Sequence, residues 1–254
     1  MIADGDDPLG EAFCRIRLPT TRRVVGATYT PMDIVTAMVS WAAYEHVQPA
    51  RIVDPGAGSG RFLAAAAECF PLSELIAVET DPVASLLLRA NATVRRFADR
   101  LVVKLADYRS VRLPRIEGTT LFIGNPPYVR HHDIGEVWKD WYARAAERCG
   151  IKASKLAGLH LHFFFKTMTL AREGDYGAFI TAAEWLDVNY GRALRQLLAD
   201  GLGGTALHVL DPAVAAFADA ATTAAITSFR VGRRPKNLRV RAVETREALN
   251  GLTT

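Results

Sequence analysis

Short apolar runs alternate with stretches of helical periodicity along the first half of the chain. The runs have the length and composition of buried strands, and they lie at 51–55, 75–79, 101–106 and 120–124. The stretches before and between them carry apolar residues at helical spacing, at about 31–46, 60–69 and 82–97. This alternation predicts a doubly wound, mostly parallel α/β sheet of the Rossmann-like type.

The second half of the chain begins with a polar insertion and then returns to strand patterns. Residues 129–160 contain an amphipathic helix, 136–148, between polar loops. Three further strands are predicted at 176–181, 205–210 and 222–231. Because no helical pattern separates the last two, we expect an antiparallel pair at one edge of a seven-stranded sheet.

The composition fits one large α/β domain. The 254 residues are 50% hydrophobic, and the formal charge of +4 agrees with a polyanionic partner. No apolar run reaches the roughly 18 residues of a membrane span, and the acidic start does not resemble a secretory signal, so we expect a cytoplasmic protein. The three cysteines have no metal-site spacing, and we expect no metal.

Residues 1–25 are interpreted as a lead-in, 26–231 as the main domain, and 232–254 as a basic linker or stub.

A Gly-rich turn follows the first strand and begins the next helix. It comprises Asp54, Pro55, Gly56, Ala57, Gly58, Ser59 and Gly60. Glycines let a backbone approach a ligand closely, and the N-terminus of the following helix favours negative charge. The spacing differs from the G-x-G-x-x-G fingerprint of nicotinamide-binding proteins, which disfavours a dehydrogenase.

Acidic residues end the second and third strands. Glu79, followed by Thr80, lies about 20 residues beyond the Gly-rich turn, where an acid can hold ribose hydroxyls. Asp107 ends the third strand, and it can accept from an adenine amino group with Tyr108 beside the ring. The alternative for Glu79 is an exposed carboxylate at the end of the strand.

The fourth strand ends in the sequence Asn125-Pro126-Pro127-Tyr128. The two prolines fix the backbone and remove two N–H donors. The Asn125 side-chain oxygen and the Pro126 carbonyl therefore remain as rigid acceptors. Such a site suits a planar group that carries an amino group, with its ring stacked on Tyr128. The alternative is a Pro-Pro turn with Tyr128 packed over it.

Ahead of the first strand, Thr28, Tyr29 and Thr30 lead into the predicted helix at 31–46. Thr30 is a favourable N-cap, and Pro31 suits the first helical position. The free N–H groups of such a helix start can also bind a ligand. Polar residues therefore converge on one edge of the predicted sheet, where open α/β sheets bind their ligands.

These motifs, in this order, resemble the gamma-class (Taq-type) N6-adenine DNA methyltransferases of restriction–modification systems. The resemblance covers about residues 20–231, and it rests on Tyr29-Thr30-Pro31, Asp54-Pro55-x-x-Gly58-x-Gly60, Glu79, Asp107 and Asn125-Pro126-Pro127-Tyr128. The run Ala183-Glu184-Trp185-Leu186 and the position of Phe217 ahead of Phe229 add to it.

The resemblance implies a class I S-adenosylmethionine-dependent methyltransferase that acts on adenine flipped out of double-stranded DNA. It implies catalytic roles for Asn125, Pro126, Pro127, Tyr128 and Phe217. It implies S-adenosylmethionine contacts for Thr28, Tyr29, Thr30, Asp54, Pro55, Gly56, Ala57, Gly58, Gly60, Glu79, Thr80, Asp107, Tyr108, Asn125 and Pro127. Members of the family usually continue into a target-recognition domain, whereas this sequence ends at Thr254, so a separate target-recognition or restriction subunit is a further expected partner.

Two alternatives stay open. Methyltransferases of protein glutamine or RNA guanine can share Asn-Pro-Pro-Tyr, although the early Thr-Pro motif, the insertion after Tyr128 and Phe217 favour DNA adenine. The chain can also be an incomplete subunit that needs a partner recognition chain.

Overall fold

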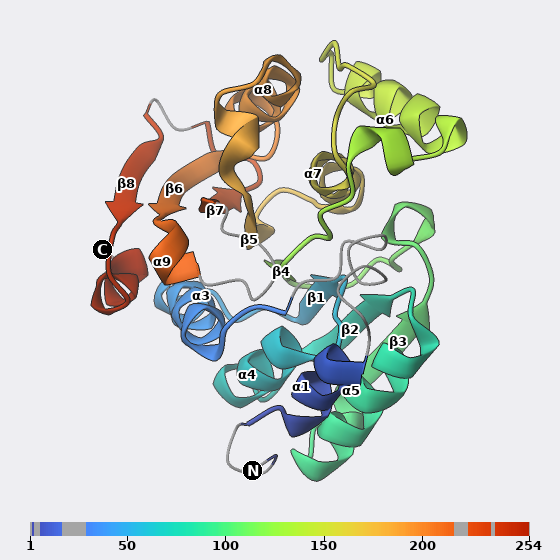
Figure 1. The fold of residues 1–254 in the computed structure, drawn as a ribbon, viewed down its shortest axis with the longest axis vertical. Helices are drawn as coiled ribbons and strands as arrows, with labels where there is room; N and C mark the ends of the chain where they lie inside the picture. The colour runs from blue at the N-terminus through green and yellow to red at the C-terminus, as the bar shows by residue number, and fades with distance from the viewer. Residues whose placement is uncertain (1, 3–5, 17–28, 216–222, 235–236, 254) are drawn as a thin grey trace.

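The computed structural model describes residues 2, 6–16, 29–215, 223–234 and 237–253, which fold around a single sheet (Figure 1). The eight strands lie in the order β3-β2-β1-β4-β5-β7-β6-β8. They are β1 (Arg51–Pro55), β2 (Glu74–Glu79), β3 (Leu101–Leu105), β4 (Thr120–Gly124), β5 (Tyr176–Ala182), β6 (Gly204–Leu210), β7 (Ala224–Arg230) and β8 (Arg239–Val243). Neighbouring strands pair in parallel, except that β7 runs antiparallel to β5 and β6. The predicted mostly parallel α/β sheet is confirmed.

Helices cover both faces of this sheet (Figure 1). They are α1 (Pro8–Ile16), α3 (Met32–Tyr44), α4 (Arg61–Cys69), α5 (Pro82–Val94), α6 (Glu136–Arg148), α7 (Leu159–Leu170), α8 (Arg192–Asp200) and α9 (Pro212–Ala215). Successive strand residues point to opposite faces, so Ile52 joins the core under α3 and α4 while Val53 joins the core under α6 and α7. Both faces are buried, which explains why apolar residues stand next to each other in β1 and β4 and do not alternate with polar ones. None of the described helices has both the length and the apolar composition needed to cross a bilayer.

The antiparallel pair lies inside the sheet and not at its edge. β6 and β7 pair as predicted, but β8 adds in parallel outside β6, from Ala206 opposite Arg239 to Leu210 opposite Val243. The sheet therefore has one strand more than predicted. β8 has the sequence Arg-Val-Arg-Ala-Val, and its first residues are exposed. Charges of this kind are common on edge strands, and here they concealed the strand in the sequence.

The two ends of the chain differ from the predicted lead-in and linker. After β8, the 3₁₀ segment η7 (Glu247–Thr253) packs on α3 and buries Leu249 and Leu252. At the other end, α1 packs on α5 and buries Phe13. Residues 237–253 and 6–16 therefore contribute to the core of the same domain.

Candidate active site

A cavity of about 610 Å³ lies at the carboxyl ends of β1, β2, β3 and β4. Many of the predicted site residues line it, namely Tyr29, Thr30, Gly56, Ala57, Gly58, Glu79, Thr80, Asp107, Tyr108, Asn125 and Pro127. Others lie in the same segments but behind the lining, namely Asp54, Pro55, Gly60, Pro126 and Tyr128. Thr28 and Phe217 lie outside the described residues. The cavity also contacts α1 and the insertion, which sequence reasoning did not include.

The Gly-rich loop passes directly beside the Asn125–Tyr128 segment. Gly56, Gly58 and Gly60 all have positive φ, between 55° and 90°, which explains the three glycines. A side chain at Gly56 would meet Pro127 Cδ at 3.5 Å and the Asn125 carbonyl oxygen at 3.7 Å. Two segments that are far apart in the sequence therefore form one wall of the cavity.

Glu79 is fixed at the end of β2 by backbone donors. One carboxylate oxygen accepts from Gly58 N at 2.8 Å, and the other accepts from Thr80 N at 2.7 Å and Asp81 N at 2.8 Å. The carboxylate lines the cavity, and the oxygen that accepts only from Gly58 N can accept a further hydrogen bond. Glu79 is therefore oriented to receive hydroxyl donors from a ligand.

Asp107 shares its carboxylate with a neighbouring arginine. The Arg109 guanidinium lies 2.7 Å from Asp107 Oδ2 and 4.0 Å from the ring centroid of Trp138. Trp138 belongs to α6, so the insertion closes this end of the cavity. Sequence reasoning missed both residues, although the arginine two positions after Asp107 and the aromatic residues of the amphipathic helix were visible signals.

Tyr108 forms part of the cavity wall beneath this pair. Its hydroxyl lies 3.0 Å from Thr167 Oγ1, and its ring centroid lies 5.1 Å from that of Phe163. Burial raises the pKa of the Tyr108 hydroxyl, so the group stays neutral. A flat apolar surface is thereby available next to Asp107.

Asp54 is a buried acid behind the Gly-rich loop. It is 1% exposed, and neither carboxylate oxygen meets a hydrogen-bond donor among the described residues. Burial, with the Glu79 carboxylate as a second cause, holds the pKa of Asp54 well above its usual range. Gly124 makes room for it, because a Cβ there would lie 2.5 Å from Asp54 Oδ1.

Thr30 holds the Asn125 side chain instead of capping a helix. Asn125 Nδ2 donates to Thr30 Oγ1 at 3.1 Å. The N-cap residue of α3, which begins at Met32, is Pro31, and in the first turn Ile34 N donates to Asp33 Oδ1. The expected N-cap role of Thr30 is therefore wrong. This hydrogen bond fixes the orientation of the Asn125 amide.

Tyr128 is half-buried next to the cavity wall. Its hydroxyl donates to the Ile180 carbonyl at 3.4 Å, and its ring meets the edge of His160 at a centroid distance of 6.3 Å. His160 and His162 are both buried in α7. Burial lowers the pKa of His160 to about 4, so a neutral imidazole supports the Tyr128 ring.

The comparisons with known proteins agree with this arrangement. Residues 116–210 match the Eco57I restriction-modification methylase family. The chain is 60% identical over 247 residues to Type II methyltransferase M.XamI of Xanthomonas campestris pv. amaranthicola, a match that covers 97% of this chain and 45% of the relative. The chain therefore spans about half the length of that relative.

Solved structures share the fold of this chain. The type IIG restriction endonuclease BpuSI superposes with a TM-score of 0.71 at 18% identity, over 96% of this chain and 31% of that one. A class I S-adenosylmethionine-dependent methyltransferase from Listeria monocytogenes superposes with a TM-score of 0.65 at 12% identity, over 89% of this chain and 72% of that one. The fold is that of the class I S-adenosylmethionine-dependent methyltransferases, as the sequence motifs implied.

Proposed function

We propose that this chain is the catalytic part of a restriction–modification DNA methyltransferase that methylates N6 of adenine. The proposal rests on the close approach of the Asn125–Tyr128 segment and the Gly-rich loop at one cavity, where Gly56 would contact Pro127 if it carried a side chain. That arrangement brings a rigid set of acceptors for an amino group next to a loop suited to a small ligand.

The residues around the cavity fit S-adenosylmethionine. The volume of 610 Å³ lies within the range of about 300–1,000 Å³ that is typical of small-molecule sites. In this proposal Glu79 accepts from the ribose hydroxyls, while Asp107 and Tyr108 hold the adenine. The loop from Asp54 to Gly60, with Thr28, Tyr29 and Thr30, holds the methionine end, and the acidity of Asp54 and Glu79 suits a cation. When bound, S-adenosylmethionine supplies a methyl group activated by its sulfonium.

The acceptor adenine is held by the Asn125–Tyr128 segment. The Asn125 oxygen and the Pro126 carbonyl accept the two hydrogens of N6, which turns the nitrogen lone pair toward the methyl donor. Flipping an adenine out of a duplex costs a few kcal/mol, and stacking on Tyr128 offsets about 1–3 kcal/mol of it. Phe217 is predicted to confine the base from another side. Position and electrostatics provide the catalysis, so no nucleophilic residue is needed.

Double-stranded DNA is the proposed substrate. The match covers 45% of the relative M.XamI, which therefore extends well beyond the matched part. We therefore propose that target recognition comes from residues outside 26–231, either in a further segment or in a partner subunit.

The test measures methyl transfer and cofactor binding separately. The purified chain is incubated with labelled S-adenosylmethionine and DNA from a host without adenine methylation, and the product nucleosides are identified by mass spectrometry. We expect N6-methyladenine with the wild type. In Asn125→Ala we expect its loss by about 10²-fold or more, while calorimetry shows cofactor affinity largely kept.

Transfer RNA and release factor serve as competing acceptors in the same assay. Label in either of them, with none in DNA, would favour the RNA or protein alternative. Failure of the wild type to bind S-adenosylmethionine would refute the proposal outright.

A further inference from the structure

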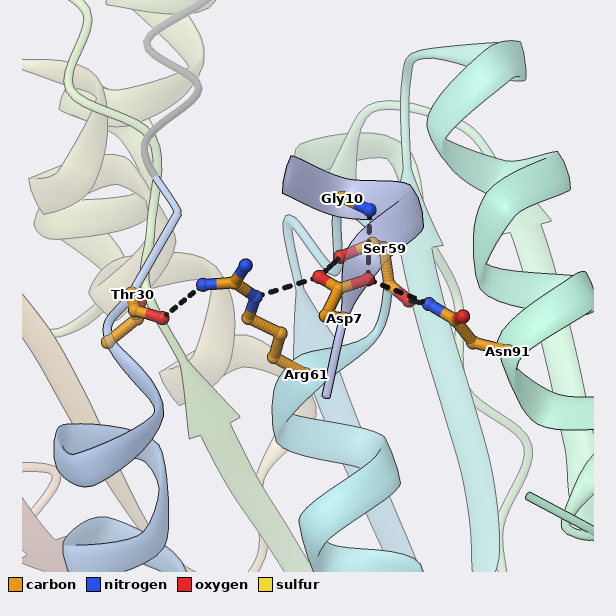
Figure 2. A network of polar contacts seen from close by, with 6 residues as sticks. All are labelled: Asp7, Gly10, Thr30, Ser59, Arg61 and Asn91. Carbon is orange, nitrogen blue, oxygen red and sulfur yellow. Dashed lines mark hydrogen bonds and ion pairs between the residues drawn. The ribbon is translucent and has the colours of Figure 1, made fainter. Parts of the chain in front are cut away.

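The N-terminal segment is hydrogen-bonded to the Gly-rich loop through one buried carboxylate, that of Asp7 (Figure 2). Asp7 is 6% exposed and accepts from Ser59 Oγ at 2.5 Å and Arg61 Nε at 2.7 Å. It also accepts from Asn91 Nδ2 at 3.0 Å and Gly10 N at 2.9 Å. The four donors come from α1, the Gly-rich loop, α4 and α5, so this carboxylate joins four separate parts of the fold.

The local sequence explains how α1 presents this carboxylate. Asp7 is the N-cap of α1, and Pro8 occupies the first helical position. Gly10 then leaves the space that the network needs, because a Cβ there would lie 2.1 Å from Asp7 Oδ2 and 2.6 Å from Ser59 Oγ. An aspartate before a proline was a visible helix-start signal, but it did not reveal the tertiary partners.

The network continues from Asp7 into the site. Arg61, held by Asp7, donates through Nη1 to the Thr30 carbonyl at 2.9 Å (Figure 2). Thr30 in turn accepts from Asn125 Nδ2 at 3.1 Å. On the other branch, Ser59 follows Gly58, whose N–H bonds Glu79. Asp7 is therefore connected both to the predicted ribose acid and to the predicted catalytic amide.

Two aromatic residues of the same N-terminal region line the cavity. Phe13 of α1 lies 6.3 Å from the ring of Tyr29, and the Arg61 guanidinium lies 5.2 Å from that ring. The region that Asp7 anchors thus contributes part of the wall of the cavity.

We propose that Asp7 is a positioning residue, through which the N-terminal helix α1 holds the Gly-rich loop and Thr30 in the arrangement that binds S-adenosylmethionine. This inference rests on the proposed function for its ligand. Asp7 does not line the cavity, so it acts through Ser59 and Arg61 and touches no bound group itself.

The test compares two variants that disturb the network with two matched controls. Asp7→Asn replaces one acceptor oxygen by an amide that faces donors, and Gly10→Ala pushes a methyl group between Asp7 and Ser59. The control Glu11→Gln changes an exposed carboxylate of the same helix. The control Asp175→Asn changes a carboxylate that is 4% exposed and accepts from two backbone N–H groups. Asp175 lies just ahead of β5, at the end of the sheet opposite to the cavity.

Calorimetry with S-adenosylmethionine gives the first readout. Asp7→Asn and Gly10→Ala should weaken binding about 10- to 100-fold, the loss expected for a charge-assisted hydrogen bond. Asp175→Asn should lower the melting temperature without changing the affinity, and Glu11→Gln should change neither. Equal affinities in the wild type and both network variants would overturn the proposal, as would a loss in Asp175→Asn of the same size.

Amide hydrogen exchange of the free protein gives a readout that needs no ligand. Exchange at residues 56–61 and at Thr30 should be faster in Asp7→Asn than in the wild type and unchanged in Asp175→Asn. If the wild type does not bind S-adenosylmethionine, the proposed function fails, and this exchange pattern still decides whether Asp7 holds the loop. Unchanged exchange in Asp7→Asn would overturn the inference.

Discussion

Two buried aspartates flank the Gly-rich loop, and their surroundings are opposite. Asp7, on the outer side, has four donors within 3.0 Å. Asp54, on the inner side, meets no donor among the described residues, and its pKa is raised by burial and by Glu79. The first carboxylate is satisfied by the protein itself, whereas the second has no donor in the part of the chain that the structure describes.

The difference separates an acid with several donors from a buried acid that meets no donor among the described residues. A buried carboxylate with several donors stabilises the charged form and ties the fold together. A buried carboxylate without donors costs stability, and groups of this kind concentrate at functional sites. The contrast predicts that removing these two acids has opposite effects on the folded protein.

The largest expected effect is the loss of Asp7. Asp7→Ala leaves the nearly buried Arg61 guanidinium without its carboxylate and removes one of the two acceptors of Asn91 Nδ2. It should lower the free energy of unfolding by about 3–5 kcal/mol. Urea unfolding of the ligand-free protein measures it. A loss below about 1 kcal/mol would mean that Asp7 contributes no more to stability than a surface ion pair does.

The opposite sign is expected at the other acid. Asp54→Asn removes a buried carboxyl group that ionises less readily in the folded than in the unfolded state. It should therefore raise the free energy of unfolding of the ligand-free protein by about 1–3 kcal/mol at pH 8. The same variant should bind S-adenosylmethionine more weakly, because an amide cannot ionise beside a cationic ligand. A less stable variant would break the comparison.

The stability difference at Asp54 should depend on pH. Its folded pKa lies above the unfolded value of about 3.9, so the folded state retains a proton that the unfolded state has lost. The free energy of unfolding of the wild type, relative to Asp54→Asn, should therefore fall as pH rises from about 4 to the raised pKa, and then become level. Unfolding curves of both proteins across this range check the sign.

Three buried histidines act in the opposite direction and cancel in that difference. Burial lowers the pKa of His160 and His208 to about 4 and that of His162 to about 3. Their depressed pKa values make stability rise with pH up to the unfolded value of about 6.5. The wild type and Asp54→Asn both contain these histidines, so their contribution cancels in the difference between the two free energies of unfolding. A difference that does not change with pH would contradict a raised pKa of Asp54.

The smallest expected effect sharpens the contrast by removing one donor. Ser59→Ala takes a hydroxyl from Asp7 but leaves Arg61, Asn91 and Gly10 in place, so the free energy of unfolding should fall by only about 1 kcal/mol. In an Asp7→Ala background the same change should cost less, and a double-mutant cycle measures this coupling. Strict additivity would show that Ser59 and Asp7 do not interact.

The sequence by itself determined the sheet and the positions of its functional ends. The apolar runs at β1, β2 and β4 are local patterns of strands buried on both faces, and each is followed by residues of a recognisable type. Glu79 and Asn125 could therefore be assigned to one edge of the sheet, because parallel strands share their carboxyl ends.

Only the tertiary structure decided what each polar residue contacts. Thr30 stands at a typical N-cap position in the sequence but accepts a hydrogen bond from Asn125, and Asp107 forms an ion pair with Arg109. Asp7 and Asp54 are both aspartates followed by proline, yet one is surrounded by donors and the other by none among the described residues. Secondary structure follows from the periodicity of near neighbours, whereas the hydrogen-bond partners of a buried side chain come from segments tens of residues away.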